Sequence, residues 1–265
     1  MVENPFDAEP VEEVYLPRAP LVHVVAQARF PKVLSLATDA GVAPVQAALA
    51  HRFPVLQEDQ TMGVLITPDG VMSQPPADVV WRLQTRDNDW QVSLSTSFIS
   101  LDTTAYVSRA DFCKRFQEVL EAFREVVNPV IAERVGMRYV NRLDDPDQLS
   151  RLGELVRAEI LGGYAVPLPD GIGLHHSVCE SVFSGGDNQV LARWGILPPN
   201  AVLDPVIVPT ERRSWVLDVD VFRDVRMDFD AATLTELVRV FADQSYRFFL
   251  WAVTDTLLAE AGGQL

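Results

Sequence analysis

The spacing of apolar residues changes twice along this chain, and that change limits its fold more than any other feature. Apolar and polar residues alternate through 79–104, and apolar residues then recur at helical spacing through 108–127. The same order returns later, with strand-like segments at 174–183, 190–197 and 215–225 and helical spacing through 231–260. Alternation is typical of strands with one buried face, and runs of strands followed by helices are typical of α+β proteins. The sequence therefore predicts antiparallel sheets with long amphipathic helices packed on them.

Turn-forming residues divide these regions into individual strands and helices. Asp87-Asn88-Asp89 and the run 184–188 each predict a hairpin between two alternating segments. Ser108, with Asp111 three residues later, predicts the start of a helix. The expected strands are 21–30, 63–68, 79–86, 90–95, 98–104, 135–142, 174–183, 190–197 and 215–225. The expected helices are 42–53, 108–127, 147–161 and 231–260.

The order of these elements suggests three divisions of the chain. Residues 1–19 carry five acidic residues against Arg18 and are expected to form an acidic, partly ordered N-terminal arm. Residues 20–145 and 146–265 form two α+β halves, and the second half ends in the long C-terminal helix. An internal duplication would explain why the halves are similar. The alternative is that any α+β chain repeats strands and helices in this way.

The charge balance restricts the partners of the chain. There are 37 Asp and Glu residues against 22 Lys and Arg residues, a net charge of −15. Nucleic-acid affinity depends on a basic surface, so this acidity disfavours nucleic acid as a partner. Cys113 and Cys179 lie far apart in sequence, which fits a reducing, cytoplasmic location. No apolar run approaches the roughly 18 residues that cross a membrane, and residues 1–20 lack the apolar core of a signal peptide.

Several short motifs resemble a single family. They are the segment LVHVVAQARFP (residues 21–31), Trp81 and Trp90 of the first hairpin, the helix start at Asp111-Phe112, and the strand GMRYVNR (residues 136–142). In these motifs the chain resembles a sporadically distributed family of uncharacterised bacterial proteins of similar length. That family shares an early strand ending in Arg-Phe-Pro and a Gly-x-Arg-Tyr-x-Asn strand. The resemblance extends over nearly the whole chain and implies no particular activity.

Three arginines four residues apart form the first candidate site. Arg134, Arg138 and Arg142 have the same parity, so on a strand they share one face. Tyr139 and Asn141 lie between them in sequence and point to the other face. An arginine-lined groove binds a carboxylate, a phosphate or an acidic peptide through bidentate hydrogen bonds. The alternative is that carboxylates on neighbouring strands pair with these arginines.

A second candidate site combines carboxylates with histidines. Asp218 and Asp220 share one face of their strand, where two carboxylates could act in acid–base catalysis or hold a divalent metal. His175 and His176 open another strand, and Glu180 shares a face with His176. These residues lack the spacing of a zinc motif, and the chain has no phosphate-binding glycine loop. No metal and no cofactor is therefore expected.

These observations favour a binding protein over an enzyme. The expected function is a cytosolic protein- or ligand-binding module with a protein or a small anionic ligand as partner, and a defence- or immunity-associated role is one context for it. The alternative is a hydrolase or metal-dependent enzyme that uses Asp218, Asp220 and nearby histidines. Residues 248–253 are apolar on every side of the C-terminal helix, so they need covering on more than one side. The second-half sheet is expected to cover one side. Either helix 108–127 or a second protomer, in a homodimer, is expected to cover the other.

Overall fold

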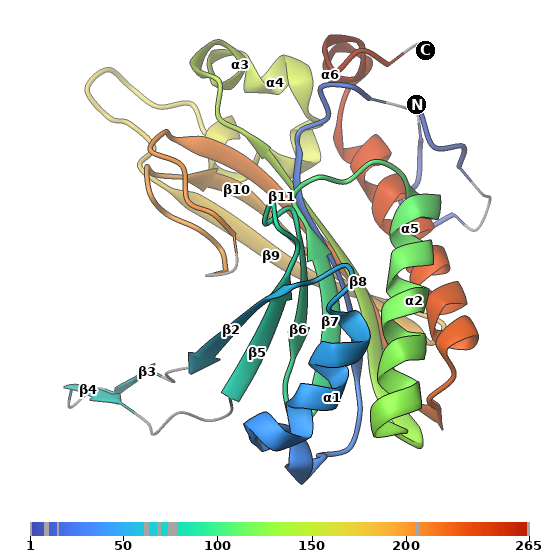
Figure 1. The fold of residues 1–265 in the computed structure, drawn as a ribbon. Helices are drawn as coiled ribbons and strands as arrows, with labels where there is room; N and C mark the ends of the chain where they lie inside the picture. The colour runs from blue at the N-terminus through green and yellow to red at the C-terminus, as the bar shows by residue number, and fades with distance from the viewer. Residues whose placement is uncertain are drawn as a thin grey trace. The chain divides into compact units, whose positions relative to one another are not determined.

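The computed structural model describes residues 2–7, 11–14, 16–60, 64–67, 70–73, 79–204 and 207–263 (Figure 1). These residues have an α+β fold in which nine strands form one sheet, in the order β2-β5-β6-β7-β1-β8-β11-β10-β9. Strands β3 and β4 form a separate hairpin. The strands are β1 (Leu21–Arg29), β2 (Val55–Gln60), β3 (Val64–Thr67), β4 (Gly70–Ser73), β5 (Val79–Gln84), β6 (Trp90–Leu94), β7 (Phe98–Thr103), β8 (Ile131–Leu143), β9 (Ser177–Gly185), β10 (Asn188–Leu197) and β11 (Ser214–Asp228).

The helices of the described residues range from one turn to six turns in length. They are α1 (Asp39–Leu49), α2 (Arg109–Val127), α3 (Pro146–Ser150), α4 (Leu152–Leu155), α5 (Ala231–Ala252) and α6 (Asp255–Glu260), with 3₁₀ turns at Leu34–Ala37, Ala158–Ile160 and Gly162–Ala165. None of them is both long and apolar enough to span a bilayer, as far as the described chain goes.

The chain forms two compact units, each assembled from segments that are distant in sequence. The first unit contains residues 25–136 and 223–239. The second unit contains residues 1–24, 137–222 and 240–265. The halves 20–145 and 146–265 expected from the order of elements stay a prediction.

Helix α2 supplies much of the core of the first unit. Ser108 caps it, because its side chain accepts a hydrogen bond from the backbone N–H of Asp111 at 3.2 Å, as the sequence predicts. The ring of Phe123 lies 5.2 Å from that of Phe30 and 5.9 Å from that of Phe229. The buried side chains of α2 follow the helical period, at Phe112, Cys113, Phe116, Val119, Leu120 and Phe123. The apolar spacing therefore identified the core face of this helix.

Helix α1 begins at Asp39, not at Val42 as expected. The side chain of Thr38 caps its first turn by accepting a hydrogen bond from the N–H of Gly41 at 3.4 Å. A Cβ at Gly41 would lie 1.8 Å from the carbonyl oxygen of Ser35. The glycine therefore permits a close backbone approach inside the helix and does not mark its boundary.

The single helix expected over 231–260 is wrong, because α5 and α6 are separate. Between them Val253 forms a β-bridge with Val156. The hydroxyl of Thr254 donates a hydrogen bond to the carbonyl oxygen of Glu154 at 2.6 Å. Thr254 has an extended backbone, with φ −94° and ψ 164°, and this residue interrupts the helix.

The helix expected over 147–161 is also wrong, because α3, α4 and a 3₁₀ turn replace it. The carboxylate of Asp145 caps α3 by accepting hydrogen bonds from two backbone N–H groups, at 2.9 Å and 3.2 Å. Arg151, between α3 and α4, departs from helical geometry with φ −122° and ψ 31°. The buried side chains Leu152 and Leu155 then anchor α4.

Two of the three large aromatic side chains near the end of α5 are buried, as predicted. Phe248 is 2% exposed and Phe249 is 5% exposed, whereas Trp251 is half-buried. Phe248 packs against Phe183 of β9, with ring centroids 6.3 Å apart, so the second-half sheet covers one side. On another side its ring lies 6.1 Å from that of Phe6. The N-terminal arm therefore covers part of Phe248 through Phe6.

Candidate anion-binding site

Four strands of the second unit carry a row of charged side chains on one sheet face. Arg193 of β10 lies opposite Glu180 of β9 and opposite Asp218 of β11. Arg138 of β8 contacts Asp218 from the next strand. The neighbouring residue Leu217 points to the opposite face and is fully buried. The row consists of Glu180, Arg193, Asp218 and Arg138, so negative and positive side chains alternate across the four strands.

Arg138 lies at the centre of a network with two carboxylates. Its Nε donates to Oδ1 of Asp218 at 2.7 Å and its Nη2 donates to Oδ2 at 2.8 Å, which is a bidentate pair. Its Nη1 donates to Oδ2 of Asp204 at 2.7 Å. Burial lowers the pKa of Arg138, but the hydrogen bonds and charges of Asp218 and Asp204 outweigh it and raise that pKa above its ordinary value. The guanidinium therefore has three of its five N–H groups on carboxylates.

Asp218 is buried and both of its oxygens are occupied. Besides Arg138, Arg193 donates to Oδ2 through Nη2 at 2.6 Å and through Nε at 3.1 Å. Only 1% of the residue is exposed. Two arginines from neighbouring strands therefore hold this buried carboxylate.

The other residues of the acid and histidine candidate site lie on β11, on β9 and in the segment just before β9. Asp220 lies opposite Leu191 on β10. His175 and His176 are exposed and precede β9 instead of opening it, because that strand begins at residue 177. Glu180 is exposed on β9. Within the described ranges, no group of three His, Cys, Asp or Glu side chains could hold a metal ion.

The other residues of the arginine candidate site have different surroundings at different points along β8. Arg134 belongs to the first unit, and its Nε lies 3.7 Å from Oδ1 of Asp224. Tyr139 and Asn141 are buried on the face opposite to the arginines, as their parity predicts. Arg142 donates from Nη1 to the carbonyl oxygen of residue 208 at 2.7 Å. Arg142 lines a pocket with a volume of about 490 Å³. None of the other four predicted binding residues lines this pocket or the described pocket of about 530 Å³.

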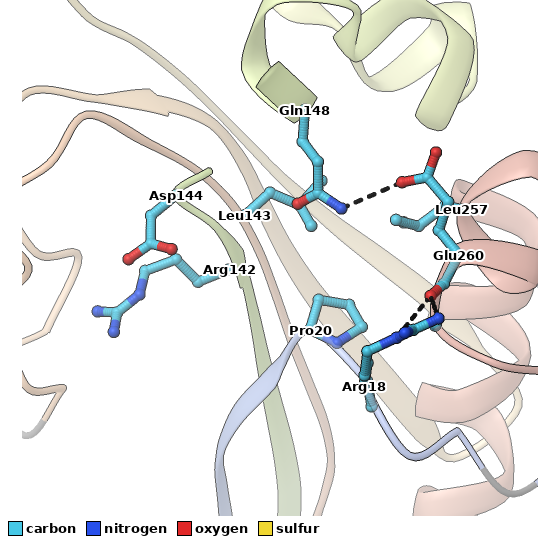
Figure 2. Close-up of a pocket in the computed structure, with 10 residues that line it drawn as sticks. Arg18, Pro20, Arg142, Leu143, Asp144, Gln148, Leu257 and Glu260 are labelled. Carbon is cyan, nitrogen blue, oxygen red and sulfur yellow. Dashed lines mark hydrogen bonds between the residues drawn. The ribbon is translucent and has the colours of Figure 1, made fainter. Parts of the chain in front are cut away.

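This pocket lies where β8 ends, β1 begins and α6 ends. The backbone N–H of Arg142 bonds to the carbonyl of Pro20 at 2.8 Å, and that of Arg18 bonds to the carbonyl of Ala261 at 3.1 Å. These bonds hold three distant segments around one cavity. Figure 2 shows Arg142 on one side, Arg18 and Glu260 on the other, and the apolar Pro20 and Leu143 between them.

The charged groups of the pocket differ in how they are paired. Arg18 donates from Nε and Nη2 to the backbone carbonyl of Glu260, at 2.9 Å and 2.6 Å. The carboxylate of Glu260 accepts hydrogen bonds from Arg151 and from Gln148, and the bond from Arg151 is the main reason that its pKa lies below the ordinary value. In the described chain, the hydrogen bonds of both pocket arginines therefore go to backbone carbonyls.

Sequence reasoning missed Arg18, Arg193, Asp204 and Glu260. Arg18 lies in the expected N-terminal arm, where its being the one cation among five acidic residues is a signal in the sequence. Asp204 and Glu260 contact residues 66 and 109 positions away, so no local spacing could reveal them.

No family model and no curated protein matches the chain. Among solved structures, it is similar to DynU16, a protein of the dynemicin biosynthetic locus, with 10% sequence identity and a TM-score of 0.22. The match covers 86% of this chain and 97% of that chain. A likeness of this size supports no argument about fold or function.

Proposed function

We propose that the protein is a ligand-binding module for a small anion that has acidic groups at both ends of an apolar body. One observation carries this proposal. Arg18 and Arg142 lie on opposite sides of one pocket of about 490 Å³, and each donates to backbone carbonyls instead of to a carboxylate. Pro20 and Leu143 lie between them, where they would contact an apolar chain. Pockets of this volume suit small molecules.

The hydrogen-bonding capacity of the arginines supports the same reading. A guanidinium has five N–H donors, and Arg142 uses Nη1 while Arg18 uses Nε and Nη2 in the described contacts. Each therefore keeps donors for an incoming carboxylate or phosphate. The carboxylates that line the pocket have donors of their own, since Glu260 accepts from Arg151 and Gln148, and Asp144 accepts from Thr210 at 3.1 Å.

A cytosolic location and a defence- or immunity-associated role belong to this proposal as its expected context. The free cysteines Cys113 and Cys179 support the location, since disulfides are rare in the cytosol. A hydrolytic or metal-dependent activity through Asp218 and Asp220 has less support, because the oxygens of Asp218 are held by two arginines.

An internal duplication is part of the same proposal, as is kinship with the bacterial family that the motifs resemble. Strands β1 and β8, the first and the last strand of the first expected half, lie side by side in the sheet. Strands β7 and β11, each followed directly by a long helix, flank them. Apart from β2, which has no counterpart, the strand order is symmetric about the β1–β8 pair, and this symmetry supports a repeat within the chain.

The proposal is tested by calorimetric titration with suberate and octanoate, which share an eight-carbon body but carry two acidic groups and one. We expect suberate to bind about tenfold more tightly, because the second carboxylate gains a charge-assisted hydrogen bond. Arg142→Ala should remove that advantage, and Arg142→Lys should restore only part of it, because lysine lacks the planar fork. Arg239→Ala, at an exposed arginine paired with Glu236, is the matched control. Equal affinity for the two ligands, or an advantage that survives Arg142→Ala, would contradict the proposal.

A further inference from the structure

We propose that the outer edge of β9 binds an extended, basic and apolar segment of another protein by strand addition. Strand β9 is the last strand of the sheet on its side, and its described pairing is with β10 over residues 177–185. An edge strand presents N–H and C=O groups that a further strand can pair with. This site shares no lining residue with the pocket of Arg18 and Arg142.

The hairpin turn determines which backbone groups face the edge. Gly185 and Asn188 pair across a two-residue turn, so they form a hydrogen-bonded pair. In an antiparallel pair, hydrogen-bonded and non-hydrogen-bonded residues alternate along the strand. The backbone N–H and C=O groups of residues 178, 180, 182 and 184 therefore point away from β10. Within β9, Glu180 is the charged residue that protects this edge, and no proline interrupts it. Val178 and Val182 are 37% and 58% exposed.

A groove runs beside the turn-proximal end of this edge. The groove has a volume of about 530 Å³. It is lined by residues 182–185 of β9, which alternate between the two faces of the strand, and by Phe6 and Phe248. The ring centroids of Phe6 and Phe183 lie 4.9 Å apart. Phe6 is nevertheless 50% exposed. The N-terminal arm thus forms one wall of the groove and leaves an aromatic surface uncovered. A large apolar side chain of an added strand fits this surface.

The charges around the groove indicate which segment it accepts. Glu3 and Asp7 are exposed on either side of Phe6 in the sequence, and Glu180 is exposed on β9. The nearby cation Arg157 is already engaged, since it donates to the carbonyl of Val2 at 2.9 Å and lies over the ring of Trp251. A basic segment complements these acids. A second copy of this chain, with a net charge of −15, would bring like charges together.

The test uses a synthetic peptide of alternating lysine and valine, which places valines on one face of a strand and lysines on the other. Its affinity for the full chain is measured by fluorescence anisotropy. We expect Val182→Pro to weaken binding about tenfold, because proline removes an edge donor that does not serve the β10 ladder. Val182→Thr keeps that donor and the strand propensity, so its affinity should stay within about threefold of the wild type. Circular dichroism confirms that both variants are folded.

Three outcomes would overturn the proposal. The first is equal peptide affinity of Val182→Pro and Val182→Thr. The second is equal binding of a peptide in which glutamate replaces lysine, which would show that the acids do not select the segment. The third is a dimer, seen by light scattering, that Val182→Pro dissociates, because a second copy would then be the occupant. If Val182→Pro does not fold, Phe6→Ala replaces it, and unchanged peptide affinity in that variant also overturns the proposal.

Discussion

Arg138 and Asp218 form a bidentate pair between β8 and β11, in which Nε–Oδ1 is 2.7 Å and Nη2–Oδ2 is 2.8 Å. Asp218 is 1% exposed, and Arg193 donates to the same carboxylate from β10. One buried anion therefore joins cations from two neighbouring strands. This pairing shows how arginines and carboxylates share one face of the sheet.

Replacing Arg138 by alanine should destabilise the protein by about 3–5 kcal/mol, because it removes a bidentate partner from a buried carboxylate. Urea unfolding measures the loss. Asp218→Asn should cost at least as much, because Arg138 and Arg193 then both lose their charged partner. A loss below about 1 kcal/mol in Arg138→Ala would show that the pair behaves like a surface ion pair.

Gly195→Ala should distort the β9–β10 pairing. Gly195 has a φ of 149°, and a Cβ there would lie 1.9 Å from the carbonyl oxygen of Ser177. The backbone must move to accept a methyl group, so we expect a loss of at least about 2 kcal/mol in urea unfolding. Gly173→Ala is the control, because nothing lies within 4 Å of its Cβ position. Similar stability of the two variants would contradict this account of Gly195.

Phe249→Ala should cost about 3–5 kcal/mol, because a buried aromatic side chain leaves a cavity. Phe249 is 5% exposed, whereas Phe6 of the arm is 50% exposed. Phe6→Ala should therefore cost about 1–2 kcal/mol, roughly in proportion to the area that it buries. Thermal and urea unfolding of the two variants compare these costs. A larger loss for Phe6→Ala would show that the arm is a core element.

Acidification should weaken the contact between α6 and the α3–α4 segment. The hydrogen bond from Arg151 lowers the pKa of Glu260, so the folded chain binds this proton less readily than the unfolded chain does. The resulting stabilisation is present above the ordinary glutamate pKa of about 4.3 and disappears as the pH falls through the lower value of the folded state.

Glu260→Gln isolates this contribution. We expect the variant to be less stable than the wild type at neutral pH, and the difference should shrink as the pH falls to about 3. The effect should be modest and salt-sensitive, because the two side chains are 36% and 30% exposed. Urea unfolding at several pH values measures it. A stability difference that stays constant with pH would rule out a role for this titration.

The parts of the fold that follow from local sequence are those with a clear hydrophobic period. Helix α2 and the hairpin of β5 and β6 follow from apolar spacing and turn residues. Strand β2 could not be predicted, because residues 55–58 are exposed and show no buried face. The break between α5 and α6 depends on the pairing of Val253 with Val156, a contact across the fold that a local pattern does not encode.

The candidate site was predictable only as a set of residue types. Parity correctly separated Arg138 and Arg142 from the buried Tyr139 and Asn141. It could not distinguish the arginine that carboxylates occupy from the one that lines a pocket, because those carboxylates arrive from distant segments. Asp204 reaches Arg138 across 66 positions, and Arg18 meets the carbonyl of Glu260 across 242 positions.

The most direct test of the central claim is an NMR titration of the arginine Nε–Hε resonances with suberate. The account predicts that the resonances of Arg18 and Arg142 shift together along one saturable curve, because one dianion contacts both groups. The resonance of Arg239, which is exposed and paired with Glu236, should not move. A titration in which neither pocket arginine responds, or in which Arg239 responds equally, would contradict the account.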